Sequence, residues 1–144
     1  MAISTIKVGG TIGKTFRVEI SADHPFVIDQ PKAGGGNDEG PNPLETFLAT
    51  LAACFCTMGR IIANQRKIEL RKIECETEGD IDKDFLMGKT DVGRSGFTEI
   101  RSFVKIDADM TEEEKKAFLH EIERRCPMAD NISKSTPLTS SIVG

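Results

Sequence analysis

The sequence contains no tryptophan and no tyrosine, and it has only two histidines, His24 and His120. Its eight phenylalanines must therefore supply all of the aromatic packing. Neither histidine has a ligand-like spacing to the four cysteines, whereas structural zinc usually requires four ligands in close pairs. The sequence therefore predicts no metal site.

A basic stripe and a long apolar run are also missing. The formal net charge is -4 at pH 7, which disfavours nucleic acid as a partner. The N-terminal residues MAISTIKVGG lack the pattern of a signal peptide. The longest uncharged stretch that suits a helix, residues 46–59, is shorter than the ~20 residues of a bilayer span. We therefore expect a cytoplasmic protein with no membrane partner.

The 144 residues and an ordinary composition, with 38% hydrophobic and 29% charged residues, predict a single globular domain over residues 1–144. Strands are predicted over residues 3–8, 16–20 and 26–28, the first two joined by the turn GGTIGKT. With Val8 the turn nearly spells a phosphate loop, but valine stands where the first glycine is required. The segment after it also suits a strand, so a hairpin turn is favoured over a nucleotide site.

A central helix is predicted to begin at Pro43, because proline suits the first helical turn. The preceding segment QPKAGGGNDEGPNP is expected to be a long loop, and a loop without a ligand is favoured over an anion site. Two stripes recur at helical spacing. The large residues are Leu44, Phe47, Leu48, Leu51, Phe55, Met58 and Ile62, and the small ones are Ala49, Ala52, Cys56, Gly59 and Ala63. This pattern predicts a helix buried nearly all round, by sheet or by a partner chain.

The second half of the chain alternates strands and helices. Strands are predicted over residues 68–81 and 97–106, and Thr111 opens a helix with a capping box. A short helix over residues 127–132 and a final strand over residues 138–143 are expected to follow. The whole order predicts a fold of the α+β class.

The chemistry of the chain depends on its cysteines. They are Cys54, Cys56, Cys75 and Cys126. Cys126 directly precedes a predicted helix, whose N-terminal end would favour thiolate with help from Arg124 and Arg125. An ordinary cysteine at a helix boundary is an equally good interpretation. Cys54 lies among large apolar residues and by itself suggests a core position. The remaining two are expected to be structural.

Two motifs resemble those of the OsmC/Ohr family, named for osmotically inducible protein C and the organic hydroperoxide resistance proteins. The segment GPNPLETFLATLAACFC is similar to the family's Gly-x-Asn-Pro loop and the helix that carries Ala-Ala-Cys, which aligns Cys54 with the first family cysteine. The segment CPMADNIS is similar to the Cys-Pro motif and aligns Cys126 with the second. With STPLTSSIV as a closing strand, the resemblance extends over nearly the whole chain.

The resemblance implies a fold and an activity. The fold is OsmC-like, with a long buried central helix packed on antiparallel β-sheets, in an intertwined homodimer with active sites between the subunits. The activity is that of a thiol-dependent peroxidase that protects against oxidative stress. Cys54 would attack an organic hydroperoxide, Cys126 would condense with the sulfenic acid, and an external dithiol, without other cofactors, would reduce the disulfide. The expected apolar pocket comprises Phe47, Leu51, Phe55 and Met58.

One departure from the family pattern concerns the polar groups of the active site. Peroxidases of this family carry a glutamate directly after Asn-Pro and an arginine in the preceding loop. Here Leu44 takes the position of the glutamate, and Glu45 is shifted by about 100° around the helix. Lys32 is the basic residue of the loop, and lysine lacks the bidentate fork of arginine. Glu45 and Lys32 are the candidate substrate contacts. The alternative function is small-molecule binding or thiol exchange without peroxidase activity.

Overall fold

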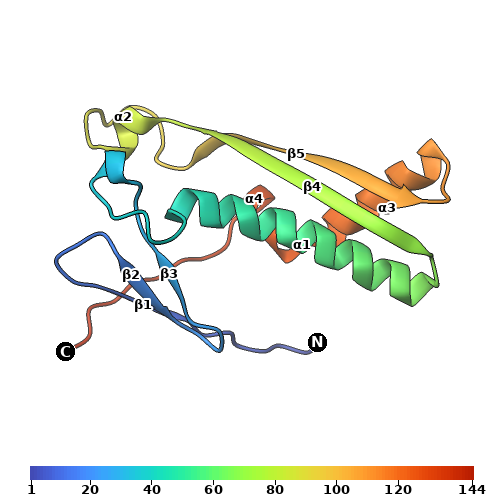
Figure 1. The fold of residues 1–144 in the computed structure, drawn as a ribbon, viewed down its shortest axis with the longest axis horizontal. Coiled ribbons are helices and arrows are strands. Elements are labelled where there is room, and N and C mark those ends of the chain that lie inside the picture. The colour runs from blue at the N-terminus through green and yellow to red at the C-terminus, as the bar shows by residue number, and fades with distance from the viewer. The chain divides into compact units, whose positions relative to one another are not determined.

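The computed structural model describes residues 1–144, which form two compact units, Met1–Phe47 and Leu48–Gly144. Five strands, in two antiparallel sheets, and four α-helices confirm the predicted α+β class. Figure 1 shows the elements in their order along the chain. The single domain over residues 1–144 stays a prediction.

The N-terminal unit contains a three-stranded antiparallel sheet with the order β1-β2-β3. Its strands are β1 (Gly9–Ile12), β2 (Val18–Ser21) and β3 (Phe26–Ile28). The predicted strand over residues 3–8 is wrong, because pairing with β2 begins only at Gly9, opposite Ser21. Strand β1 therefore lies in the segment that was expected to be the turn. The chain continues from that segment into strand β2, as expected for a hairpin.

The loop between β3 and the first long helix is held by Asp29, whose side chain is buried. Its carboxylate accepts hydrogen bonds from the backbone N–H groups of Gln30 at 2.7 Å, Asn37 at 3.3 Å and Glu39 at 3.1 Å. Burial opposes the charged form, but these N–H groups outweigh it and lower the pKa of Asp29. The loop, which includes the 3-10 helix η1 (Lys32–Gly34), is therefore ordered around one carboxylate.

The long helix α1 (Pro43–Arg66) begins where the sequence predicts it. The Asn42 side chain accepts the N–H of Glu45 at 2.8 Å, and the Asn42 carbonyl accepts the N–H of Thr46 at 2.9 Å. The first bond satisfies a donor that the first helical turn leaves free, and the second is the first regular bond of the helix. The loop and the helix are therefore joined by a capped boundary.

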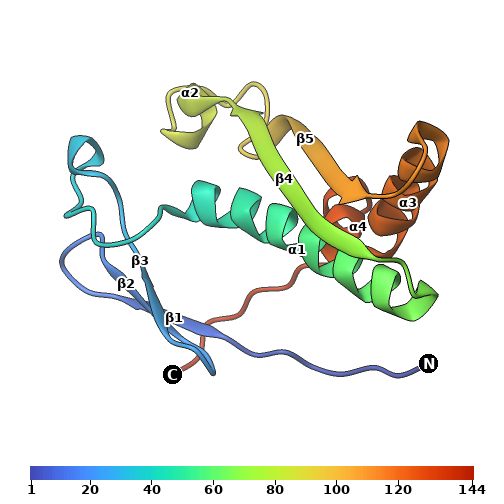
Figure 2. The ribbon, with the colours of Figure 1, turned by 45° about the vertical axis from the view of Figure 1, so that its right-hand side comes forward.

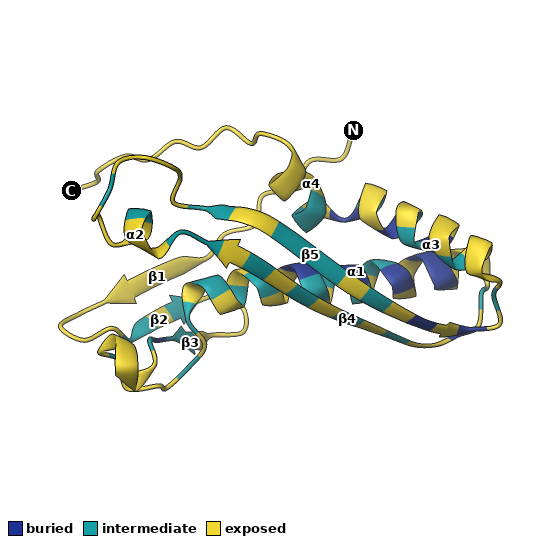
Figure 3. Ribbon diagram, turned by 90° about the horizontal axis from the view of Figure 1, so that it is seen from above, coloured by how far each residue is buried: buried dark blue, intermediate teal, exposed yellow.

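Burial of α1 is one-sided in the single chain, as Figure 3 shows. Its buried residues are Leu51, Phe55, Gly59, Ile62 and Ala63. Ala53, Thr57 and Ile61 on the other side are exposed, so the predicted burial nearly all round, by sheet or by a partner chain, stays a prediction. With 24 residues and a mean hydropathy of 1.6 over its best window, α1 is long and apolar enough to cross a membrane. The core helix of a globular protein can have the same composition.

The C-terminal unit is built around a long hairpin of two strands, with helices that follow it in the chain. The strands are β4 (Leu70–Ile81) and β5 (Phe97–Ala108), and the helices are α2 (Lys83–Leu86), α3 (Glu112–Arg125) and α4 (Pro127–Ser133). Cys75 pairs with Val104, and the inward-facing residues of both strands are less exposed than their neighbours. Both predicted strands are confirmed to within two residues, and α2 lies in the connection between them.

Two predictions about the last third of the chain have opposite outcomes. The capping box is confirmed, because Thr111 accepts the N–H of Glu114 at 3.1 Å and Glu114 accepts the N–H of Thr111 at 2.8 Å. The strand predicted over residues 138–143 is wrong for the single chain, in which these residues pair with no other strand. A segment cannot form a strand without a neighbouring strand to bond to.

The core of the C-terminal unit lies where α1, α3 and the hairpin meet, and Figure 2 shows α3 beside the second half of α1. Its buried members are Leu51, Phe55, Ile62, Ala63, Leu70, Ile106, Ala108, Phe118, Ile122 and Cys126. Gly59 allows this close approach, because a Cβ atom there would lie 2.8 Å from Ile73 and 3.4 Å from Ile122. The core therefore includes one of the two candidate redox cysteines.

Candidate functional site

The structure brings together the two cysteines that the sequence motifs single out. The sulfur atoms of Cys54 and Cys126 lie 2.9 Å apart, although the residues are 72 positions apart in the chain. The Cys126 thiol donates a hydrogen bond to the Cys54 sulfur. A disulfide requires an S–S distance of about 2.05 Å, so a movement of about 1 Å would allow the bond to form. Both thiols are free in the structure.

Each sulfur is positioned by a regular element. Cys54 lies in the middle of α1, half-buried and packed against the core. Cys126 is the last cap of α3 and the first cap of α4, with an extended backbone at φ -79° and ψ 113°. Pro127 fixes the first position of α4, and the Ala129 N–H bonds to the Cys126 sulfur at 3.4 Å. The sulfur of Cys126 is therefore held from two directions, by Ala129 and by Cys54.

Burial decides the protonation of Cys126. Its side chain is fully buried. Burial first, and then the hydrogen bond with Cys54, raise the pKa of the Cys126 thiol to about 11, although the Ala129 N–H acts in the other direction. The sequence places Cys126 correctly at a helix start, and of the two interpretations left open the raised pKa favours an ordinary buried cysteine over a thiolate. The loss of hydration on burial raises the pKa of Cys126 by more than the N-terminus of the short helix α4 lowers it.

The two arginines before Cys126 do not supply the charge that was expected from them. Arg124 binds the Glu121 carboxylate through two nitrogens, at 2.8 and 3.0 Å. Arg125 donates to the Gln65 side chain at 2.9 Å and lies 3.9 Å from Glu121. Hydrogen bonds from Arg124 lower the pKa of Glu121, which stays charged and compensates them. Neither arginine is hydrogen-bonded to Cys126.

The apolar residues expected around Cys54 differ in burial. Leu51 and Phe55, on either side of Cys54 along α1, are each 4% exposed and belong to the core. Met58, one turn after Cys54, is half-buried and packs against the same core. Phe47 belongs to the N-terminal unit and is 45% exposed. A substrate pocket made by these residues stays a prediction.

The two polar candidates lie in the N-terminal unit. Lys32 is the first residue of η1 and is exposed. Glu45 is exposed in the first turn of α1. It precedes Cys54 by about two and a half helical turns, so the two side chains leave α1 on opposite sides. Their contact with a substrate stays a prediction.

The other two cysteines lie away from the Cys54 sulfur. The Cys56 thiol faces strand β4, 3.8 Å from the Ile73 carbonyl oxygen, and burial raises its pKa. Cys75 contacts the Thr77 hydroxyl at 3.6 Å. No group of three or more His, Cys, Asp or Glu side chains is placed to hold a metal ion. We assign no metal ligand.

Sequence reasoning missed an Arg–Glu pair in the N-terminal unit. The Arg17 guanidinium binds the carboxylates of Glu39 and Glu19, each at 2.7 Å. Arg17 and Glu39 are 22 positions apart, and only the folding of the Asp29 loop brings them together. The buried role of Asp29 was missed too. The one feature of the sequence that could have indicated this role is the position of Asp29, directly after an apolar strand and before a glycine-rich segment.

Comparison with known proteins identifies relatives that cover most of this chain. A family model described as OsmC-like protein matches residues 35–141, which include both motifs. The hydroperoxide reductase of Mycoplasma genitalium is 32% identical over 109 residues, which cover 75% of this chain and 72% of that protein.

Solved structures show the same fold. The OsmC like protein from Mycoplasma pneumoniae superimposes with a TM-score of 0.79 at 21% identity, covering 92% of this chain and 89% of that one. The organic hydroperoxide resistance protein OhrB of Bacillus subtilis superimposes with a TM-score of 0.60 at 24% identity, covering 93% of this chain and 94% of that one. At such identities the likeness is one of fold.

Proposed function

The chain belongs to the family of OsmC-like proteins, and we propose that it is a thiol-dependent reductase of organic hydroperoxides that uses Cys54 and Cys126 as its redox pair. The observation that carries this proposal is the 2.9 Å separation of the two sulfurs. The name of the Mycoplasma genitalium relative, a hydroperoxide reductase, supports the choice of substrate. The position of Cys54 among Leu51, Phe55 and Met58 supports an apolar peroxide rather than a small polar one.

The direction of the hydrogen bond supports different roles for the two cysteines. Cys126 keeps its proton at neutral pH, because burial raises its pKa to about 11. It donates that proton in a hydrogen bond to the Cys54 sulfur. Cys54 is also the less buried of the two. Cys54 is therefore the attacking thiolate and Cys126 the resolving thiol.

The proposed reaction has three steps. The Cys54 thiolate attacks one peroxide oxygen, the O–O bond breaks, and the released alkoxide takes up a proton to give the alcohol. Cys54 is now a sulfenic acid. The Cys126 sulfur attacks the Cys54 sulfur, and the sulfenic hydroxyl leaves as water with the proton of the Cys126 thiol. An external dithiol reduces the disulfide by exchange and is itself oxidised.

The proposed working form is a homodimer in the cytoplasm. Residues 1–8 and 138–143 carry exposed apolar side chains, and they pair with no strand in the single chain. Ile61 on the exposed side of α1 is 37% exposed. A partner chain would cover such surfaces, which are expensive to leave in water. Four free thiols suit a reducing compartment.

A second candidate function is ligand binding or thiol exchange without peroxide reduction. The observation that favours it is Leu44, which stands where the family peroxidases carry glutamate. Glu45 leaves α1 on the side opposite Cys54, so it does not directly replace that group. Only the first function requires peroxide to oxidise Cys54.

Disulfide mapping tests the redox pair. Reduced protein treated with one equivalent of cumene hydroperoxide should lose two of its four free thiols. Trypsin should then release peptides 33–60 and 126–134 joined by a disulfide. Because peptide 33–60 contains both Cys54 and Cys56, Cys56→Ser serves as the matched control and should retain the link, whereas Cys54→Ser should lose it. A link that persists in Cys54→Ser, or four thiols that survive the peroxide, would refute the proposal.

A further inference from the structure

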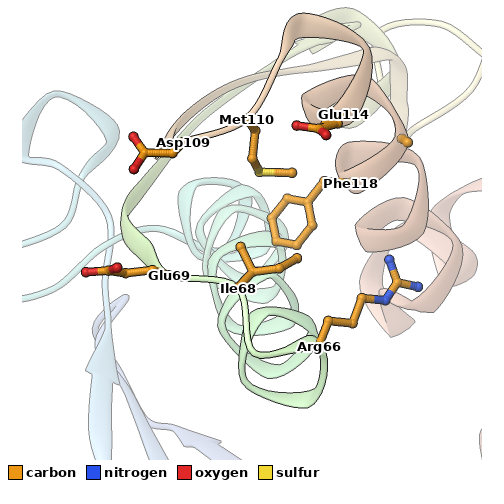
Figure 4. A pocket seen from close by; sticks show the side chains of 8 residues that line it. Arg66, Ile68, Glu69, Asp109, Met110, Glu114 and Phe118 are labelled. Carbon is orange, nitrogen blue, oxygen red and sulfur yellow. The ribbon is translucent and has the colours of Figure 1, made fainter.

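A cavity lies in the C-terminal unit at the end of α1. The cavity has a volume of about 460 Å³ and is shown in Figure 4. It is lined by the last residue of α1, the link to β4, the turn after β5 and the first turns of α3, with the residues Arg66, Ile68, Glu69, Asp109, Met110, Glu114, Ala117 and Phe118. A volume of this size lies within the range of small-molecule sites, about 300 to 1,000 Å³.

The floor of the cavity is apolar and firmly held. Phe118 is 2% exposed and belongs to the core, and Met110 and Ile68 pack against that core. Ile68 is directed inward by the end of α1, where Lys67 adopts φ 55° and the Ile68 N–H bonds to the Ala63 carbonyl at 2.8 Å. This is the Schellman ending, which brings the residue after the turn back onto the helix. Figure 4 shows Met110, Phe118 and Ile68 together at the centre.

The rim of the cavity carries negative charge. Three carboxylates, from Glu69, Asp109 and Glu114, lie on two sides of the apolar centre, with Arg66 on another. The one cation of the lining, Arg66, lies 3.5 Å from the Glu121 carboxylate, which offsets its charge. Asp109 is paired with Arg71 at 3.2 Å, but its side chain is 92% exposed and the pair is screened by water. The rim therefore attracts cations and repels anions.

We propose that this cavity binds an amphipathic organic cation, meaning an amine or a quaternary ammonium group on an apolar body. The apolar body would cover Met110, Phe118 and Ile68, and the cationic head would lie among the three carboxylates. The C-terminal end of α1 adds partial negative charge on the same side. An anionic amphiphile of the same size would meet three like charges.

The proposed site is distinct from the cysteine pair. Arg66 follows Cys54 by 12 positions on one continuous helix, which corresponds to about 18 Å along its axis. None of the lining residues is hydrogen-bonded to either redox sulfur. The proposed cation site therefore does not rest on the peroxidase activity, and refuting either proposal would not affect the other.

Methionine NMR of the full-length protein tests the proposal with octyltrimethylammonium as the probe. The chain has five methionines, so methyl-labelled protein gives few signals, and Met110→Leu identifies the one at the cavity. The Met110 signal should shift and saturate, while those of Met58 and Met128 near the cysteines should not. Octyl sulfate and octanol, with the same tail, should bind at least several-fold more weakly.

Variants at the rim distinguish recognition of charge from non-specific hydrophobic binding. Glu69→Gln should weaken binding by about two- to five-fold, the range expected for one exposed charge. Ala117→Arg, at an exposed helix position on the rim, should abolish it. Glu113→Gln makes the same change outside the cavity and should leave affinity unchanged. Equal binding of octyl sulfate, equal binding of octanol, or no Met110 shift would each overturn the proposal.

Discussion

The buried thiol of Cys126 should make the protein unusually sensitive to alkaline pH. Burial and the hydrogen bond with Cys54 raise its pKa to about 11 from an ordinary value of 9.0. A raised pKa means that the folded state holds a proton that the unfolded state has already lost. The contribution of this group to stability is fully present below pH 9.0 and is lost as the pH rises to about 11.

The size of the effect follows from the shift. Each pH unit between the two pKa values costs about 1.4 kcal/mol of unfolding free energy per proton. Two units therefore cost between about 2 and 3 kcal/mol, a large share of the roughly 5 to 15 kcal/mol that a domain has. The chain has no tyrosine, so no phenol titrates in this window.

Urea unfolding between pH 8 and 11, under a non-thiol reductant, measures this loss. Wild type should lose about 2 to 3 kcal/mol more than Cys126→Ala over the window, although the variant starts out less stable because it leaves a small cavity. Cys75→Ala removes a half-buried thiol from the same unit and controls for general alkaline effects. Parallel profiles for wild type and Cys126→Ala would refute the assignment of Cys126 as a buried neutral donor.

Three further predictions concern the local devices of the fold. Asp29→Asn should accelerate hydrogen exchange at the N–H groups of Asn37 and Glu39, because an amide accepts fewer of the bonds that order the loop; unchanged exchange would contradict the role of the carboxylate. Lys67→Gly should raise the unfolding free energy by up to about 1 kcal/mol, since glycine suits the φ of 55° found there, and a lower melting temperature would speak against it. Thr111→Ala should cost about 1 kcal/mol by removing the capping box, whereas Thr111→Ser, measured in parallel by urea unfolding, should cost much less.

Local signals in the sequence predicted most of the helices and the long hairpin. Pro43 and Thr111 mark helix starts that the structure confirms, because capping depends on residues within one turn of each other. The strands β4 and β5 alternate along their length, and this pattern is also local. The Cys-Pro motif placed Cys126 correctly at the start of α4 for the same reason.

The errors come from features that depend on distant partners. Residues 3–8 and 138–143 have the composition of strands, but a strand exists only where another strand bonds to it. The one-sided burial of α1 is likewise decided by what packs against it, which the periodicity of one helix does not specify. A single chain satisfies these patterns only in part.

The chemistry of the site likewise combines local features, which the sequence predicts, with features that depend on distant residues. The motifs identified Cys54 and Cys126, but their contact joins residues 72 positions apart and arises from packing of α1 against the joint of α3 and α4. The raised pKa of Cys126 reflects burial in that packing, which outweighs the local signal of a helix start. The Arg17–Glu39 pair was missed because its partners meet only through the loop that Asp29 folds.

The most direct measurement is steady-state consumption of cumene hydroperoxide with an excess of dithiol, comparing wild type, Cys54→Ser and Cys126→Ser. Wild type should turn over the peroxide, and Cys54→Ser should be inactive. In a parallel reaction without dithiol, which would itself reduce a sulfenic acid, Cys126→Ser should react once and then accumulate Cys54 as a sulfenic acid, detectable by dimedone labelling. A wild type that consumes no peroxide, or a Cys54→Ser variant as active as wild type, would contradict the proposed function.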